Sequence, residues 1–342
     1  MDVRAMTKNE LAEVIERNKE HPDPALISGA AAVRDKYYGR RIFVRGLIEF
    51  TNYCKNNCLY CGIRCANRRI SRYRLTRAEI LSCVQRGMEL GLSTFVLQGG
   101  EDIYYSDDVL CDIVFSIKEY SPECAVTLSV GERSYESYKR LREAGADRYL
   151  LRHETADKVH YEKLHPSEMS FDNRLRCLYD LRSLGYQVGA GFMVGSPYQS
   201  SETLAEDLLF LKELEPHMVG IGPFISQTDT PFGDMPNGTL ELTLTMLALV
   251  RLMLPETLLP ATTALGTIDR KGREKGFDAG ANVVMPNLSP SERRADYALY
   301  DNKLCTGAEA AESIEMLRGL IERAGYTMDM GRGDSLVKTF DS

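Results

Sequence analysis

The stretch Thr51-Asn52-Tyr53-Cys54-Lys55-Asn56-Asn57-Cys58-Leu59-Tyr60-Cys61-Gly62 contains three cysteines in the spacing C-x3-C-x2-C. Three thiolates this close in sequence can converge on one soft metal centre, and thiolates suit zinc or an iron–sulfur cluster. A closed structural zinc site needs four ligands. Three cysteines on a four-iron cluster instead leave one iron open to a small molecule. Cys65 supplies a fourth cysteine, so a zinc knuckle is an alternative at this point.

The position of the cysteines favours the cluster. Residues 41–50 (RIFVRGLIEF) are rich in β-branched and aromatic side chains, which is typical of a strand. The cysteine loop would then leave the C-terminal end of a strand, and (β/α)8 barrels carry their chemistry at that end.

Composition limits the classes of protein that fit. The chain has 342 residues and 44% hydrophobic content, enough for a sizeable core. Its formal net charge of −7 argues against a nucleic-acid-binding surface. No apolar run could span a membrane, and the charged residues 1–20 lack a signal-peptide core. We therefore predict a cytoplasmic protein without nucleic-acid or membrane partners, and without a disulfide framework for its nine cysteines.

Predicted strands and amphipathic helices alternate between residues 41 and 288. The strands are expected at 41–51, 93–99, 125–131, 148–154, 187–195, 218–225, 257–265 and 281–288. The helices are expected at 77–90, 107–120, 134–144, 171–184, 202–214, 240–254 and 270–279. Eight strands alternating with helices is the count of a (β/α)8 TIM barrel, whereas doubly wound sheets usually have fewer strands. We predict an α/β fold with one domain: a helical lead-in (1–39), the barrel (40–288) and a C-terminal extension (289–342).

Polar and small residues follow several predicted strands, where the barrel mouth would lie. Gly99 and Gly100 lack a Cβ and let a ligand approach the backbone closely. Arg152 and Glu154 end the fourth strand, and Arg174 begins the next helix. These charges suit a ribose, an amine or a carboxylate. By local sequence, Arg152 and Glu154 are as well explained by a structural ion pair, and Arg174 is better explained by a solvated helix arginine. Tyr297 and Tyr300 lie beyond the eighth strand, where a returning chain would cap the mouth.

The cysteine spacing, with Tyr60 before the last cysteine, resembles the radical S-adenosylmethionine (SAM) superfamily. Other segments resemble the HydE family of FeFe-hydrogenase maturases, in its biotin synthase-like branch. They are VLQGGED (96–102), DRYLLRHETA (147–156), MVGIGPFI (218–225), ATTALGT (261–267) and GANVVMPN (280–287). The resemblance runs from about residue 34 to 305. It implies a full (β/α)8 barrel.

The resemblance also implies one 4Fe-4S cluster, with SAM bound to its open iron. The catalytic and metal-binding residues would be Cys54, Cys58 and Cys61. The residues that bind SAM would be Tyr60, Gly99, Gly100, Glu101, Ser129, Arg152, Glu154 and Arg174. The residues expected around the substrate are Gln98, Thr127, Thr262, Thr263, Met285, Tyr297 and Tyr300. We expect a cavity lined mainly by neutral hydroxyl groups.

In the implied reaction, an electron from the cluster cleaves SAM to methionine and a 5′-deoxyadenosyl radical. The radical would act on a cysteine-ligated Fe(CO)2(CN) complex that is made by the partner maturase HydG, and the product would pass to the scaffold HydF. A ferredoxin or flavodoxin would be the reductant. Some HydE proteins hold a second cluster with three C-terminal cysteines. Only Cys305 is present here, so we expect no second cluster.

Two alternatives differ from this prediction. The first is a lysine mutase resembling methylornithine synthase, a sister family that also has a cysteine four residues after the triad. It would need an amino-acid-sized pocket with paired charges for the amine and carboxylate. The second is a non-enzymatic zinc or iron–sulfur protein.

Overall fold

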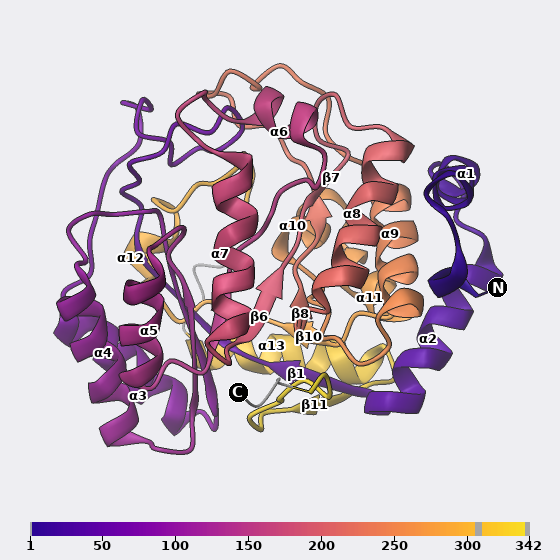
Figure 1. Ribbon diagram of the computed structural model, residues 1–342. Helices are drawn as coiled ribbons and strands as arrows, with labels where there is room; N and C mark the ends of the chain where they lie inside the picture. Colours follow the sequence, from indigo (N-terminus) through magenta and orange to yellow (C-terminus); the bar gives the residue numbers. More distant parts are fainter. Residues whose placement is uncertain (1, 305–309, 339–342) are drawn as a thin grey trace.

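A ring of parallel strands lies at the centre of the computed structural model, which describes residues 2–304 and 310–338 (Figure 1). The strands are β1 (Arg41–Val44), β2 (Gly46–Thr51), β3 (Thr94–Gly99), β4 (Ala125–Ser129), β5 (Arg148–Leu150), β6 (Gln187–Ala190), β7 (Met193–Val194), β8 (Met218–Val219), β9 (Gly222–Pro223), β10 (Val283–Val284) and β11 (Thr327–Asp329).

The helices are the short 3-10 helix η1 (Val3–Ala5), α1 (Lys8–Asn18), α2 (Pro24–Tyr38), α3 (Arg77–Glu89), α4 (Asp107–Tyr120), α5 (Tyr135–Glu143), α6 (Lys158–Leu164), α7 (Phe171–Ser183), α8 (Ser201–Leu214), α9 (Leu240–Met253), α10 (Thr263–Ile268), α11 (Gly272–Asp278), α12 (Ser291–Arg294) and α13 (Ala310–Arg323).

Single bridges close the sheet into a barrel. Strands pair in the order β2-β3-β4-β5-β6-β8, and β1 and β2 are two halves of one strand, separated by Arg45. Beyond β8, Met218 pairs with Leu258, Pro260 pairs with Val283, and Val283 pairs with Phe43 of β1. All of these pairings are parallel. The barrel predicted from the sequence is therefore confirmed.

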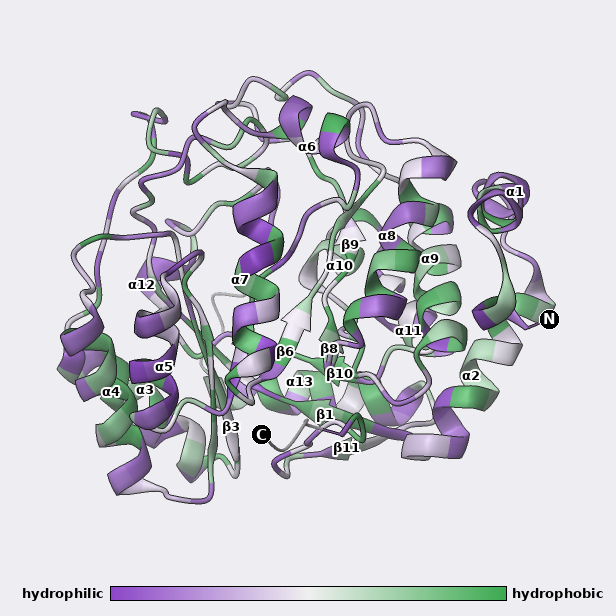
Figure 2. Cartoon of the chain, viewed as in Figure 1, coloured by the Kyte–Doolittle hydropathy of each residue, from purple (hydrophilic) through white to green (hydrophobic). Residues whose placement is uncertain are grey.

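The helices around the barrel begin at serine or threonine caps. A side-chain oxygen of the capping residue accepts a backbone N–H in the first turn at Thr76, Ser106, Ser134, Ser170, Ser200 and Thr239. Such a cap stabilises a helix by about 1 kcal/mol. The helices bury apolar side chains, such as Ile80 of α3 and Ile117 of α4, which are fully buried; green stretches mark the apolar residues of these helices in Figure 2. The helical lead-in is also confirmed: α1 packs on α8 and α2 packs on α9.

Several predicted strands are shorter than expected or interrupted. The segment 148–154 is a strand only at Arg148–Leu150, 218–225 is divided into β8 and β9, and 281–288 is a strand only at Val283–Val284. Two further departures have a local physical reason. The segment 257–265 was expected to be a strand, but a helix, α10, begins at Thr263 because the Thr262 hydroxyl accepts the Leu265 N–H at 3.4 Å. The fifth strand is divided into β6 and β7 at Gly191, whose φ is +152°. A Cβ at Gly191 would lie 2.0 Å from the Gly220 carbonyl oxygen. This close approach requires glycine and interrupts the ladder.

The C-terminal extension covers both ends of the barrel. Residues 297–303 lie at the mouth, where Lys303 reaches Glu49. The last described residues lie at the opposite end instead. Strand β11 pairs with β1, and beyond it Asp334 forms an ion pair with Arg148 at 2.7 Å. The expectation that the returning tail caps the mouth therefore holds only for its first part.

Buried histidines make stability depend on pH. Burial lowers the pKa of His153 and His165 to about 3 and that of His217 to about 4. The unfolded chain, with histidine pKa values near 6.5, binds more protons than the folded protein between about pH 4 and 6.5. We expect the free energy of unfolding to fall on acidification through this window, by up to about 1.4 kcal/mol per pH unit for each histidine.

Urea unfolding of the reduced apo-protein at several pH values would measure this dependence. A His217→Gln variant should lose part of the slope, whereas His21→Gln, at an exposed position, should keep it. A midpoint that does not change between pH 7 and 5 would contradict the prediction.

Candidate active site

Arg72 holds the cysteine loop in shape from within. Its guanidinium donates to the carbonyl oxygens of Ile63 at 2.9 Å, Arg64 at 2.6 Å and Asn67 at 3.1 Å, and to that of Asn52. No carboxylate of the described chain accepts from Arg72, so its positive charge stays beside the cysteines. Thiolates and a negatively charged cluster would be stabilised by that charge.

The three cysteines are partly buried, and Cys65 is exposed. Burial raises the pKa of each thiol in the triad, that of Cys61 to about 12. These groups therefore remain thiols at neutral pH unless a soft metal displaces the protons. A buried thiol loses its proton readily only when a metal compensates the buried negative charge, whereas an exposed thiol does not need a metal for this. The burial of the three thiols is therefore one signal of a ligand site.

The described His, Cys, Asp and Glu side chains form no group of three or more that would hold a single metal ion. A zinc knuckle needs four ligands converging on one ion. A four-iron cluster is larger, and each thiolate binds a different iron. The spacing and burial of Cys54, Cys58 and Cys61 fit the cluster, with Cys65 outside.

Tyr60 lies in sequence between the last two cysteines of the triad and is partly buried. Its hydroxyl lies 3.2 Å from Nε2 of His165, and the two rings meet edge to face. This contact fixes the loop against the segment that follows α6.

The end of β3 packs directly on the cysteine loop. A Cβ at Gly100 would lie 2.2 Å from the Tyr53 carbonyl oxygen, so glycine is required there for close packing. The Glu101 carboxylate accepts the Glu132 N–H at 3.0 Å and pairs with Lys55 at 3.1 Å. Glu101 thus connects the cysteine loop to the end of β4. Gly100 and Glu101 have a structural role that the sequence alone did not separate from ligand binding.

A chain of charged groups crosses the mouth beside the loop. The Arg174 guanidinium pairs with Glu132 at 2.6 Å and donates to the Arg152 carbonyl oxygen at 3.1 Å. Arg152 in turn pairs with Glu154 at 3.1 Å. Three residues predicted from the sequence therefore lie together. The sequence analysis missed Glu132, although an acid after a Gly at a strand end is the signal that would have found it.

Glu154 has a strained backbone that its neighbours support. Its φ is +67°, a left-handed conformation that is uncommon for any residue except glycine. Asp207, from α8, accepts the Ala156 N–H at 2.6 Å and lies 3.2 Å from His153 Nε2. Both side chains are fully buried. The Asp207–His153 pair therefore holds the turn that presents Glu154.

Strand register places the predicted substrate residues in two layers. Glu49, Gln98 and Ser129 pair side by side across β2, β3 and β4. Gln98 also donates to the Tyr297 hydroxyl at 3.4 Å. Thr127 lies one layer deeper, paired with Arg148. Thr127 and Ser129 therefore face different depths of the barrel.

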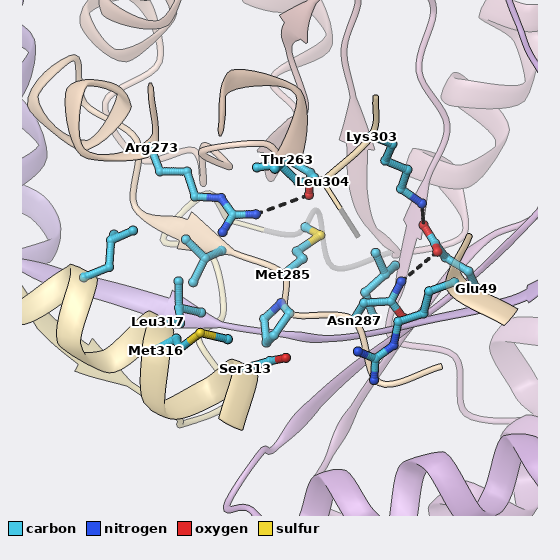
Figure 3. Close-up of a pocket in the computed structure, with 15 residues that line it drawn as sticks. Glu49, Thr263, Arg273, Met285, Asn287, Lys303, Leu304, Ser313, Met316 and Leu317 are labelled. Carbon is cyan, nitrogen blue, oxygen red and sulfur yellow. Dashed lines mark hydrogen bonds and ion pairs between the residues drawn. The ribbon is translucent and has the colours of Figure 1, made fainter. Parts of the chain in front are cut away.

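A cavity of about 200 Å³ extends from the upper barrel toward α13. Figure 3 shows Met285, Thr263 and Arg273 around it, with Arg273 directed toward the Thr263 hydroxyl at 3.5 Å. Thr262 is the cap of α10 and is not among the residues that line this cavity. Burial raises the pKa of Tyr300 to about 12, so its hydroxyl stays neutral at neutral pH.

Charged side chains reach the cavity as well as hydroxyls. Lys303 pairs with Glu49 at 2.5 Å, and Asn287 donates to the same carboxylate at 2.7 Å. Burial raises the pKa of Glu49. The expectation of a mainly neutral, hydroxyl-lined cavity is therefore wrong. Strand alternation could have placed Glu49 inside with Leu47 and Thr51, but no local signal identified Lys303 as its partner.

The parallel barrel and its cysteine loop define a radical SAM enzyme. The Radical SAM superfamily profile matches residues 48–211. The "[FeFe] hydrogenase maturase subunit HydE" of Thermotoga maritima is 47% identical over 325 residues, which cover 95% of this chain and 92% of that protein. The "3-methylornithine synthase" of Methanosarcina barkeri is 32% identical over 87% of this chain and 84% of that protein.

Among solved structures, that of methylornithine synthase (PylB) superposes with a TM-score of 0.83 at 28% identity, covering 96% of each chain. The chain belongs to the radical SAM superfamily as a HydE-like member. Enzymes of this kind use a 4Fe-4S cluster and SAM, and the cysteine triad fits that cluster. No described helix has the length and apolar character needed to cross a membrane.

Proposed function

We propose that this chain is a maturase of the FeFe-hydrogenase cofactor. The observation that supports this most is the 47% identity to HydE along 95% of the chain. When bound, the cluster and SAM would supply a 5′-deoxyadenosyl radical. The proposed substrate is the HydG-derived, cysteine-ligated Fe(CO)2(CN) complex, and HydF would receive the product.

The side chains divide the work of binding. Cys54, Cys58 and Cys61 would hold the cluster, and Arg72 would offset its charge. Arg152, Glu154 and Arg174 would hold the polar groups of SAM at the mouth. The remaining predicted contacts with SAM are Tyr60, Gly99, Gly100, Glu101 and Ser129.

The substrate would lie below SAM in the upper barrel. Gln98, Thr262, Thr263, Met285, Tyr297 and Tyr300 would contact it, and Thr127 would contact a deeper part. The Glu49–Lys303 pair is satisfied internally, so it needs no charged ligand to balance it. Among the described lining residues the one carboxylate, Glu49, is already paired, so the cavity offers no free anionic partner for the amine of a lysine.

A lysine mutase of the methylornithine synthase type is the second candidate. The 32% identity and the TM-score of 0.83 favour it to a lesser degree. Its substrate has charged ends that need partners in a buried site. Arg273, which reaches the cavity with only a long contact to Thr263, is the described cation best placed to hold a carboxylate.

The two candidates predict different substrates for the same reduced protein. We expect 5′-deoxyadenosine to form with SAM and the iron complex, and no turnover with lysine. The measurement is substrate-dependent 5′-deoxyadenosine by liquid chromatography. Turnover with lysine alone would assign the chain to the methylornithine synthase type. Silence with both would leave the substrate to be found by testing other compounds.

A further inference from the structure

The charge of the cysteine loop differs from that of the whole chain. Residues 52–74 contain six cationic side chains and no Asp or Glu, although the chain carries a net charge of −7. The six are Lys55, Arg64, Arg68, Arg69, Arg72 and Arg74. This segment rises over the mouth at the upper left of Figure 1, between β2 and α3. Purple, hydrophilic stretches mark it in Figure 2.

Two of these cations serve the loop itself. Arg72 binds four backbone carbonyls, as described above. Arg64 donates to the Asn57 side chain at 2.6 Å, within the same loop. The charges of Arg72 and Arg64 thus stabilise the shape of the loop and make the electrostatic potential around the cysteines more positive. Neither accounts for the cations that face solvent.

Three other cations point outward. Arg68 is exposed and has no hydrogen bond or ion pair within the described chain. Arg69 is 78% exposed, and its partner Asp229 is only 20% exposed. Lys55 is 53% exposed above a nearly buried Glu101. The carboxylates that pair with Lys55 and Arg69 are less exposed than these two cations, so the solvent-facing member of each pair is positive.

An apolar projection adjoins the positive surface. Ile103 is 84% exposed and Tyr104 is 61% exposed, on the loop after β3. Arg74 lies 3.8 Å from the ring centroid of Tyr53 and 4.8 Å from that of Tyr104, and so connects this loop to the cysteine loop. Exposed apolar and aromatic groups beside arginine are typical of protein contacts.

We propose that this cationic collar, defined as Lys55, Arg68, Arg69, Ile103 and Tyr104, docks an acidic one-electron carrier protein. Three collar residues belong to the segment that carries the cysteine triad, and Lys55, next to Cys54, pairs with Glu101 on the loop that carries Ile103 and Tyr104. Electron delivery to the triad needs a donor close to it. On docking, the carrier loses one electron and the cluster gains it; no bond forms or breaks. The proposal rests on the proposed function only for the presence of the cluster, not for the identity of the substrate.

Charge complementarity selects the partner. Steering by opposite charge raises association rates by about ten- to a thousandfold and weakens as salt rises. A small, strongly acidic carrier would find the collar even though the rest of the chain is acidic and repels it. The overall charge opposes nucleic acid as the partner.

The test compares an acidic protein donor with a small chemical one. SAM cleavage would be driven by photoreduced flavodoxin or by dithionite, in wild type, Arg68→Glu and the double variant Arg68→Glu/Arg69→Glu. With flavodoxin at low salt we expect kcat/KM to fall about threefold in the single variant and about tenfold or more in the double variant. The difference should shrink at high salt. The dithionite-driven rate and the iron content should not change.

Matched controls separate docking from general charge. Lys139→Glu/Arg318→Glu reverses the same charge on α5 and α13, away from the loop, and should keep the wild-type rate. Arg68→Glu alone avoids placing a new acid beside Asp229. Loss of iron in the variants would show that the cations serve the cluster and would overturn docking.

Unchanged rates with both flavodoxin and a ferredoxin, or a wild-type rate independent of salt, would also overturn the proposal. The proposal would also be overturned if the variants lost binding to a DNA duplex while their flavodoxin-driven rates stayed unchanged. Reduction of the cluster can be followed by electron paramagnetic resonance without any substrate. If the protein did not turn over the iron complex, that result would therefore count against the proposed function and not against the collar.

Discussion

Replacing Cys58 by alanine should abolish SAM cleavage. Its thiol is one of the three proposed to hold the cluster, and burial raises its pKa, which keeps it protonated until a metal binds. With two ligands left, the cluster should not be retained, and the rate should fall by at least about a thousandfold, because the cofactor supplies the radical chemistry. Iron and sulfide per chain after anaerobic reconstitution, together with 5′-deoxyadenosine, measure the effect. The same result is expected for Cys54→Ala and Cys61→Ala.

Cys65→Ser is the matched control. Cys65 lies in the same loop, but it is exposed and its backbone N–H is bonded to Asn56. We expect about four irons per chain and normal cleavage in this variant. Loss of the cluster would make Cys65 a ligand and revive the zinc-knuckle interpretation. About eight irons in wild type would indicate a second cluster; Cys305, the cysteine that would hold part of it, lies outside the described residues.

The barrel was predictable because its signals are local. Hydroxyl caps such as Thr76 and Ser106 mark helix starts, and the predicted bounds of α4 agree with the structure. The β-branched content of residues 41–51 indicated the first strand. The seventh strand was harder, because Thr262 reads equally well as a strand residue and as a helix cap. The closure of the barrel, through the bridge between Pro260 and Val283, decides whether Thr262 is a strand residue or a helix cap.

The candidate site was predictable where chemistry and sequence position coincide. The cysteine spacing predicts a ligand set, and Arg152 and Glu154 follow a strand at the mouth. Partners from distant segments were not predictable. Glu132, Asp207 and Lys303 each meet a predicted or buried site residue from another part of the chain. The position of Glu132 after a strand end could mark it as a site candidate, but nothing in the nearby sequence indicates which residue any of the three contacts.

Long-range contacts also explain the two ends of the extension. Residues near 300 follow the eighth strand directly and stay at the mouth. Strand β11 instead uses the free edge of β1, because β1 and β2 separate at Arg45 and only β2 pairs with β3. An edge of this kind recruits any nearby strand. Its availability depends on the local break in the first strand, which no periodicity revealed.

Removing Glu154 or Arg174 should weaken SAM binding without removing the cluster. Both side chains are mostly buried in the charged chain at the mouth. A hydrogen bond to a charged group contributes about 1.5–3 kcal/mol, which corresponds to about ten- to a hundredfold in affinity. Equilibrium dialysis of SAM against reconstituted Glu154→Ala and Arg174→Ala would measure the loss. The SAM affinity of Arg174→Lys should lie between those of the wild type and Arg174→Ala, because lysine keeps the positive charge but lacks the planar guanidinium that donates in two directions.

Controls for this prediction come from the same helix and the same network. Arg176→Ala removes a half-exposed arginine of α7 that pairs with Asp180 and should leave SAM affinity unchanged. Glu132→Gln keeps the shape of the Arg174 partner but removes its charge. A loss of affinity there would show that Glu132 acts by positioning Arg174. Iron content and thermal unfolding identify variants that fail to fold. Wild-type affinity in folded Glu154→Ala and Arg174→Ala would remove both residues from the SAM site and leave their ion pairs as supports of the barrel mouth.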